Sequence, residues 1–191
     1  MSLLKSNSVQ IGQSATATQN FTLSVPSSPD GTIKLARGNS GATTADVLSV
    51  ASDGRLSFGK PPTGSIIQVV QYTFTAQSAT TSSSYTDTVI TGAITPSSDT
   101  SKILVSISTN ALINATGYSY INLVRGSTQV IEWGSYQSTT WGPVSLTYLD
   151  SPSASSSVTY KVQQRVASGS ATAYVGWGSP LESVMVLQEV A

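Results

Sequence analysis

A nine-residue stretch near the C-terminus decides the fold class: Val158-Thr159-Tyr160-Lys161-Val162-Gln163-Gln164-Arg165-Val166. Its even-numbered positions are mostly apolar, whereas its odd-numbered positions are polar or charged. A period of two residues is typical of a β-strand with one buried face and one face in water. Because no stretch shows a convincing 3.6-residue helical period, the sequence predicts an all-β protein.

Runs of the same kind recur from residue 65 onward, and turn-forming Pro, Gly, Ser and Asp separate them. Short strands at this spacing predict an antiparallel β-sandwich of the jelly-roll type. The strands are expected at 66–75, 85–91, 102–112, 118–125, 129–133, 144–149, 158–167, 172–177 and 183–190.

The first 64 residues have a different character. Their apolar runs, at 21–25, 32–36, 47–50 and 55–58, are short and contain too few large side chains to form a core alone. Residues 60–64, Lys-Pro-Pro-Thr-Gly, predict a stiff, extended connection. We therefore expect a β-arm at 1–64 that needs a partner surface, followed by a sandwich knob at 65–191. The arm residues expected to dock are Phe21, Leu23, Val25, Ile33 and Leu35.

The composition excludes several kinds of chemistry. The chain has 35 Ser and 24 Thr, but no His and no Cys, and only 9% of its residues are charged. Without His or Cys, neither a Ser-His-Asp nor a Cys-His nucleophile can be assembled, and a zinc site lacks its usual ligands. No disulfide can form. We expect a protein that is not an enzyme and that holds no cofactor and no metal.

Charge and hydropathy also limit the partners. The net charge is zero, and the nine Lys and Arg are spread along the chain, so no basic stripe is available for nucleic acid. No apolar run approaches the roughly 18 residues of a membrane-spanning helix. The first six residues have no apolar segment typical of a signal peptide. We expect neither a nucleic-acid nor a membrane partner.

Two motifs match catalytic spacings, but their contexts are wrong. Residues 54–60 have the Gly-x4-Gly-Lys spacing of a phosphate-binding loop, yet Pro61 replaces the hydroxyl residue that holds magnesium. Ser57 and Lys60 have the spacing of a Ser-Lys pair, yet the accompanying motifs are missing. The carboxylates lie mostly in predicted turns, so nothing indicates the facing pair of a glycosidase.

Aromatic side chains mark one loop of the knob. Trp133, Tyr136 and Trp141 bracket residues 134–140. Exposed Trp and Tyr at loop tips suit the binding of sugars or proteins, because they supply contact area with little loss of entropy. The alternative is that Trp133 fills the core or a seam between subunits. We expect Trp141, before Gly142-Pro143, to be the most exposed of the three.

The last predicted strand is apolar on both faces over Val184, Met185, Val186 and Leu187. One face of a sandwich strand needs only the opposite sheet, whereas an apolar second face needs another cover. A neighbouring subunit is the preferred cover, and burial in the centre of the sandwich is the alternative. These four residues are therefore the expected subunit interface.

Several stretches together resemble structural proteins of tailed-phage virions. Residues 9–14 and 20–23, followed by 31–44, are similar to a module found in phage fibre and virion proteins. Residues 121–128 with 148–152, and 159–163 with 183–190, resemble the C-terminal jelly-roll tips of such proteins. The resemblance implies a homotrimer similar to the C1q and tumour-necrosis-factor jelly rolls, with the last strand near the threefold axis.

Proteins of this kind have at least two roles. One is a capsid decoration (cement) protein, which stabilises the head, contacts the major capsid protein and displays its knob on the capsid outer surface. The other is a tail fibre or tailspike component that acts as a receptor-binding adhesin. Because about 64 residues precede the knob without heptads or collagen repeats, decoration is preferred. Host-surface glycan is a further expected partner, through the loop at 134–142.

Overall fold

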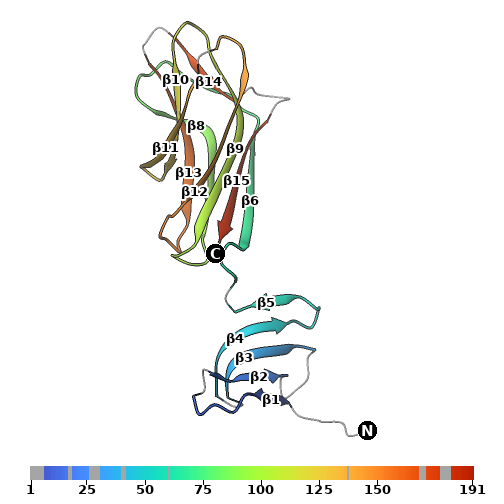
Figure 1. Ribbon diagram of the computed structural model, residues 1–191. Helices are drawn as coiled ribbons and strands as arrows, with labels where there is room; N and C mark the ends of the chain where they lie inside the picture. The colour runs from blue at the N-terminus through green and yellow to red at the C-terminus, as the bar shows by residue number, and fades with distance from the viewer. Residues whose placement is uncertain are drawn as a thin grey trace. The chain divides into compact units, whose positions relative to one another are not determined.

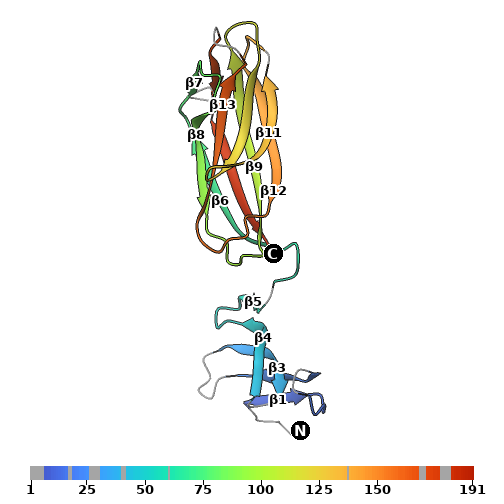
Figure 2. The same ribbon diagram turned by 90° about the vertical axis from the view of Figure 1, so that its left-hand side faces the viewer.

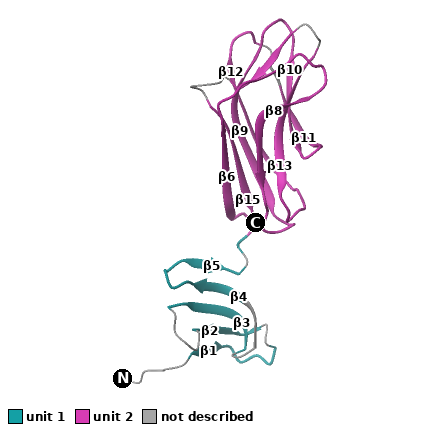
Figure 3. Ribbon diagram, turned by 180° about the vertical axis from the view of Figure 1, so that it is seen from behind, with its two compact units in different colours: residues 1–62 teal, residues 63–191 magenta. Residues whose placement is uncertain are grey.

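The computed structural model describes residues 7–16, 19–25, 31–39, 42–59, 61–136, 138–167, 171–176 and 182–191. For residues 42–45, 135 and 136 it describes the backbone and not the side chains. The chain divides into two compact units, Met1–Pro62 and Thr63–Ala191 (Figure 3). The sequence predicts the boundary between residues 64 and 65, at the end of the Pro-Pro-Thr-Gly connection, two residues after the division seen in the structure. Residues 26–30, Lys60 and Trp177 lie outside the described residues.

Unit 1 is a single antiparallel sheet in which consecutive strands are neighbours, in the order β1-β2-β3-β4-β5 (Figure 1). Turn residues separate the strands, as at Asp53-Gly54, where Gly54 has a φ of +82° that a side chain would strain. The strands are β1 (Ser8–Ile11), β2 (Phe21–Ser24), β3 (Ile33–Asn39), β4 (Ala42–Val50) and β5 (Leu56–Phe58).

Unit 2 is a sandwich of two antiparallel sheets (Figures 1 and 2). One sheet has the order β11-β10-β13-β8. In the other, β6-β15-β9 continues to β12 on the far edge of β9, while β14 and β7 extend the sheet beyond the end of β15. The strands are β6 (Ile66–Phe74), β7 (Ser78–Thr80), β8 (Thr86–Ile94), β9 (Lys102–Ile113), β10 (Ser119–Arg125), β11 (Thr128–Tyr136), β12 (Gly142–Asp150), β13 (Val158–Val166), β14 (Ala173–Val175) and β15 (Ser183–Val190).

This strand order is that of an eight-stranded jelly roll, because strands β6, β9, β12 and β15 form one layer and strands β8, β10, β11 and β13 form the other. The two layers enclose a main core, to which alternate residues of the strands contribute, and a smaller second cluster around Ile113 and Val166. The largest fully buried side chains in the main core include Ile90, Ile103, Leu123, Tyr160 and Leu187. The predicted all-β sandwich is therefore confirmed.

The stretch that opened the sequence analysis behaves as its period predicts. β13 alternates between buried and half-buried positions along its whole length, with Tyr160 and Val162 in the core. Gln164 is the exception, because it is a polar side chain that is buried. Two strands were not predicted as such: β1 and the three-residue β7.

Candidate interaction surfaces

One face of the unit 1 sheet carries an apolar residue from every strand. Directly paired residues of neighbouring strands point to the same face. The register pairs Val9 with Leu23, Leu23 with Leu35, Leu35 with Leu48, and Leu48 with Phe58. Together these five residues form one continuous row across the sheet.

Further apolar residues flank that row on the same face. Ile33, Val50 and Leu56 form a second row, and Ile11 pairs with Phe21 on the other side. We call this set of ten residues the apolar arm face: Val9, Ile11, Phe21, Leu23, Ile33, Leu35, Leu48, Val50, Leu56 and Phe58. Six of them are exposed, between 38% for Phe21 and 63% for Leu56, and the other four are half-buried.

The opposite face of the sheet is the more buried one, although it is polar. Thr22 and Ala36 are almost fully buried there, and the Thr22 hydroxyl donates a hydrogen bond to the Gly38 carbonyl at 2.9 Å. Asn20 is fully buried and bonds to both Ser14 and Asn39. In the single chain, the polar face of this sheet is therefore the buried one and the apolar face is the more exposed one.

The structure brings together the five arm residues that the sequence proposed for docking. Phe21, Leu23, Ile33 and Leu35 belong to the apolar arm face. Val25 lines a shallow hollow with Val9, Leu23 and Ile33. Sequence reasoning missed the outer parts of this face, on β1, β4 and β5. The signal in the sequence was a period of two residues, because a single polar residue separates Val9 from Ile11 and Leu56 from Phe58.

The outer face of the sheet containing β15 is the second candidate surface. Its register aligns Val69, Gln188, Leu104 and Leu149 in one row. The next rows are Gln71, Val186, Ser106 and Thr147, then Thr73, Val184, Ser108 and Ser145. None of these residues is charged, and Val69 and Leu149 are about half exposed. We call these three rows the uncharged knob face.

The predicted subunit interface on the last strand is divided between the two faces of this sheet. Met185 and Leu187 are fully buried in the sandwich core, whereas Val184 and Val186 are half-buried on the uncharged knob face. Burial in the centre of the sandwich therefore accounts for Met185 and Leu187, and a subunit interface stays a prediction for Val184 and Val186. The inner pair has its cover within the chain, and the outer pair is available to a partner.

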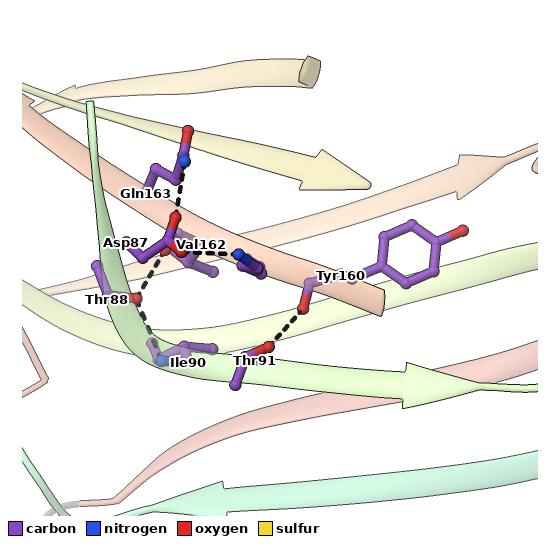
Figure 4. A network of polar contacts seen from close by, with 8 residues as sticks. Asp87, Thr88, Ile90, Thr91, Tyr160, Val162 and Gln163 are labelled. Carbon is purple, nitrogen blue, oxygen red and sulfur yellow. Dashed lines mark hydrogen bonds and ion pairs between the residues drawn. The ribbon is translucent and has the colours of Figure 1, made fainter. Parts of the chain in front are cut away.

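The outer face of the other sheet differs, because it is rich in charge. Lys161 Nζ and Gln163 Nε2 each lie 2.7 Å from a different oxygen of Asp87, and hydroxyls of Thr88 and Thr91 bond to carbonyls of β13 (Figure 4). The hydrogen bond from Lys161 holds the pKa of Asp87 below its usual range. These contacts join β8 to β13.

A second polar cluster lies on the same sheet. The Arg165 guanidinium is 3.9 Å from the centre of the Tyr120 ring and 5.1 Å from that of Tyr85. The Tyr85 hydroxyl donates a hydrogen bond to Glu132. Burial, with the contribution of Glu132, raises the pKa of Tyr85 to about 12. The cluster connects strands β10, β11 and β13 with Tyr85, the residue before β8, through groups that satisfy one another.

The three aromatic residues predicted to form a binding loop occupy different environments. Trp133 lies on β11 and packs against the core, and its indole N–H has no hydrogen-bond partner among the described residues. Trp141 is half-buried, with its ring centre 6.2 Å from that of Tyr174. The side chain of Tyr136 lies outside the described residues. The contribution of these residues to glycan binding stays a prediction.

Buried ionisable groups in the knob are held by internal partners. The Tyr160 hydroxyl and Arg125 both donate to Asp150 Oδ2 at 2.6 Å.

Within the described ranges, no group of three or more Asp and Glu side chains is placed to hold a metal ion. Among the same residues, no helix is long and apolar enough to cross a membrane. The candidate functional features of the described residues are therefore the two uncovered faces, and the polar clusters are contacts within the knob.

No family model and no curated protein matches the chain. Solved structures of viral capsid proteins do. One is a chain in the structure of the infectious bursal disease virus Gx strain, which is 15% identical in sequence. The match covers 90% of this chain and 48% of the viral chain, with a TM-score of 0.35. Another is a chain in the crystal structure of the VP2 subviral particle of the same virus, which is 14% identical. That match covers 91% of this chain and 47% of the viral chain, with a TM-score of 0.37. The chain thus spans just under half the length of these proteins, and the likeness carries no function to it.

Proposed function

We propose that the protein is a structural component of a phage virion, a homotrimeric capsid decoration protein. In this proposal the knob trimerises through the uncharged knob face, and the arm attaches the trimer to the major capsid protein on the outer surface of the head. The alternative role is that of a tail fibre or tailspike component acting as an adhesin.

The observation that carries the proposal is the pair of uncovered surfaces. The arm carries rows of exposed and half-buried apolar residues, the type of patch that soluble monomers seldom expose. The knob carries an uncharged face of mixed Val, Leu, Ser, Thr and Gln residues, and depletion of charge is a feature of the core of subunit interfaces. Two such surfaces on one chain favour a protein that assembles with others. The sequence resemblance to phage virion proteins adds the setting in which that assembly occurs.

The uncharged knob face can pack against copies of itself. Val184 and Val186 lie in the middle of the sheet, flanked by Ser106, Ser108 and the residues of β6. Small, uncharged neighbours allow copies of the same face to approach one another without burying an unpaired charge. The charged outer face, with Asp87 and Lys161, then remains in water.

Localisation on purified particles tests the role. Gold-labelled antibodies against the knob, viewed by electron microscopy, are expected to decorate the head with many copies. A few copies confined to the tail would replace decoration with the adhesin role. Particles that carry no label, although they contain every other structural protein, would contradict a virion role altogether.

A further inference from the structure

We propose that the apolar arm face is covered by the same face of two further copies of this chain, so that three arms share one apolar core. This inference rests on the trimer of the proposed function and names the partner of one of its surfaces. The major capsid protein is the competing occupant.

The first step is that, among the described residues of unit 1, none covers this face. Val9, Leu23, Leu35, Leu48 and Phe58 cross the whole sheet in register, and no described residue of unit 1 forms a second layer over them. A single sheet with one apolar face is not independently stable unless that face packs against something.

The second step concerns the other side of the sheet. That side is already closed, because Asn20 and Thr22 are buried and hydrogen-bonded to Ser14 and Gly38. Lys34 and Asp46 form an ion pair at 3.1 Å on the same side, with both side chains about half exposed. A partner that stabilises the arm by burying apolar area must therefore approach the apolar arm face.

The third step is self-compatibility. An interface between identical faces places each residue near copies of its neighbours, so a charge in the middle would meet its own like. The ten residues of the apolar arm face include no charged side chain. Arg37 on β3 continues the Ile11–Phe21 row on this face and is exposed. The other two rows, through Leu35 and through Val50, can be buried against their own copies without desolvating a charge.

The fourth step is the shape of the face. Asn7, Val9, Leu23, Val25 and Ile33 line a shallow hollow on it. Sheets that pack face to face lie about 10 Å apart, with side chains of one filling gaps between those of the other. A hollow between apolar rows provides such a gap for a side chain of the facing arm.

The fifth step is the number of copies. Each arm is covalently linked to its knob through residues 61–64, so a trimeric knob tethers three arms to one another. Short links of this kind raise the effective concentration of the second and third arm to about the millimolar range. Arms that associate only weakly in isolation would therefore pair completely within the trimer.

Cysteine crosslinking in the full chain tests the inference, and the chain has no cysteine of its own. Leu35→Cys and Leu56→Cys place a thiol on the apolar arm face, and Ser57→Cys places one on the opposite face of the same strand as Leu56. With a short bismaleimide and no other protein present, we expect the two Leu variants to form covalent dimers in at least fivefold excess over Ser57→Cys.

Native mass spectrometry of the same samples separates the outcomes. A trimer in which the Leu variants crosslink no more than Ser57→Cys would overturn the shared arm core and leave the trimeric knob intact. Protection of the Leu thiols that arises only when virus particles are added would also overturn it, with the shell as the occupant. Failure of the proposed virion role would be seen separately, in the localisation experiment.

Discussion

At the scale of single residues, Glu189 is the least expected feature of the knob. It is a fully buried carboxylate at the end of β15, and its Oε1 accepts hydrogen bonds from the Ser97 amide at 2.7 Å and the Ser101 hydroxyl at 2.7 Å. Gln68 donates to its other oxygen at 2.6 Å. Desolvation alone would raise the pKa of Glu189, but these hydrogen bonds outweigh it and hold the pKa below its ordinary value of 4.5.

This carboxylate makes knob stability depend on pH. A group whose pKa is lower in the folded state stabilises that state above its unfolded pKa, and the contribution is lost as the pH falls through the folded pKa. We expect the urea midpoint of unfolding to be steady from pH 7 to 5 and to fall below about pH 4.5. Glu189→Gln should lower the free energy of unfolding by about 2 kcal/mol at pH 7.

The comparison of the two proteins isolates Glu189, because Asp87, whose pKa is also lowered, is present in both. The Gln variant should lose less stability than the wild type between pH 5 and 3. Parallel loss of stability in the two proteins would show that Glu189 is not the titrating group.

At the scale of elements, the two layers of the knob meet closely at one glycine. A Cβ on Gly92 in β8 would lie 2.5 Å from the ring of Tyr72 in β6 and 3.0 Å from the sulfur of Met185 in β15. The Tyr72 hydroxyl is also held at 2.7 Å by the carbonyl of Ala93, so the ring has little freedom to retreat. Glycine is required here by packing and not by its backbone conformation.

Gly92→Ala is therefore expected to lower the free energy of unfolding by about 1–3 kcal/mol, measured by urea titration. Gly134→Ala in β11 is the matched control, because a Cβ there would meet no heavy atom within 4 Å. The control should change the value by less than about 0.5 kcal/mol. Equal midpoints for Gly92→Ala and the wild type would contradict the close packing of these layers.

The sequence predicted elements better than it predicted their neighbours. The two-residue period located most strands, because burial against one core imposes that period directly. β7 was missed because three residues show too little of a period, and β1 because its alternation is brief. Strand order and register, such as Leu23 against Leu35, depend on contacts between distant segments. The burial of Thr22 could not be predicted. It lies between the apolar Phe21 and Leu23, which is the position where a two-residue period places a polar side chain in water.

The candidate surfaces were likewise predicted in part. Phe21, Leu23, Ile33 and Leu35 were grouped by hydrophobicity alone, and the sheet places them on one face. The uncharged knob face was foreseen only at Val184 and Val186. Its remaining members, such as Ser106 and Thr147, are ordinary polar residues whose meaning comes only from their alignment across four strands.

At the scale of the whole molecule, each unit leaves one uncharged surface uncovered. The apolar arm face and the uncharged knob face belong to two different compact units, yet both have the features of interfaces between identical copies. The low charge of the chain agrees with the proposed assembly, because few charges mean little repulsion between copies that lie side by side. Self-association is thus the central claim of the account.

Native mass spectrometry of the full chain tests that claim most directly, with Val186→Asp as the disrupting variant and Thr159→Asp on the charged sheet as its control. The wild type and Thr159→Asp should both have three times the chain mass of 19.8 kDa. Val186→Asp should have 19.8 kDa, because its carboxylate would be buried without a partner. A wild-type mass of 19.8 kDa at every concentration up to the millimolar range would contradict the account.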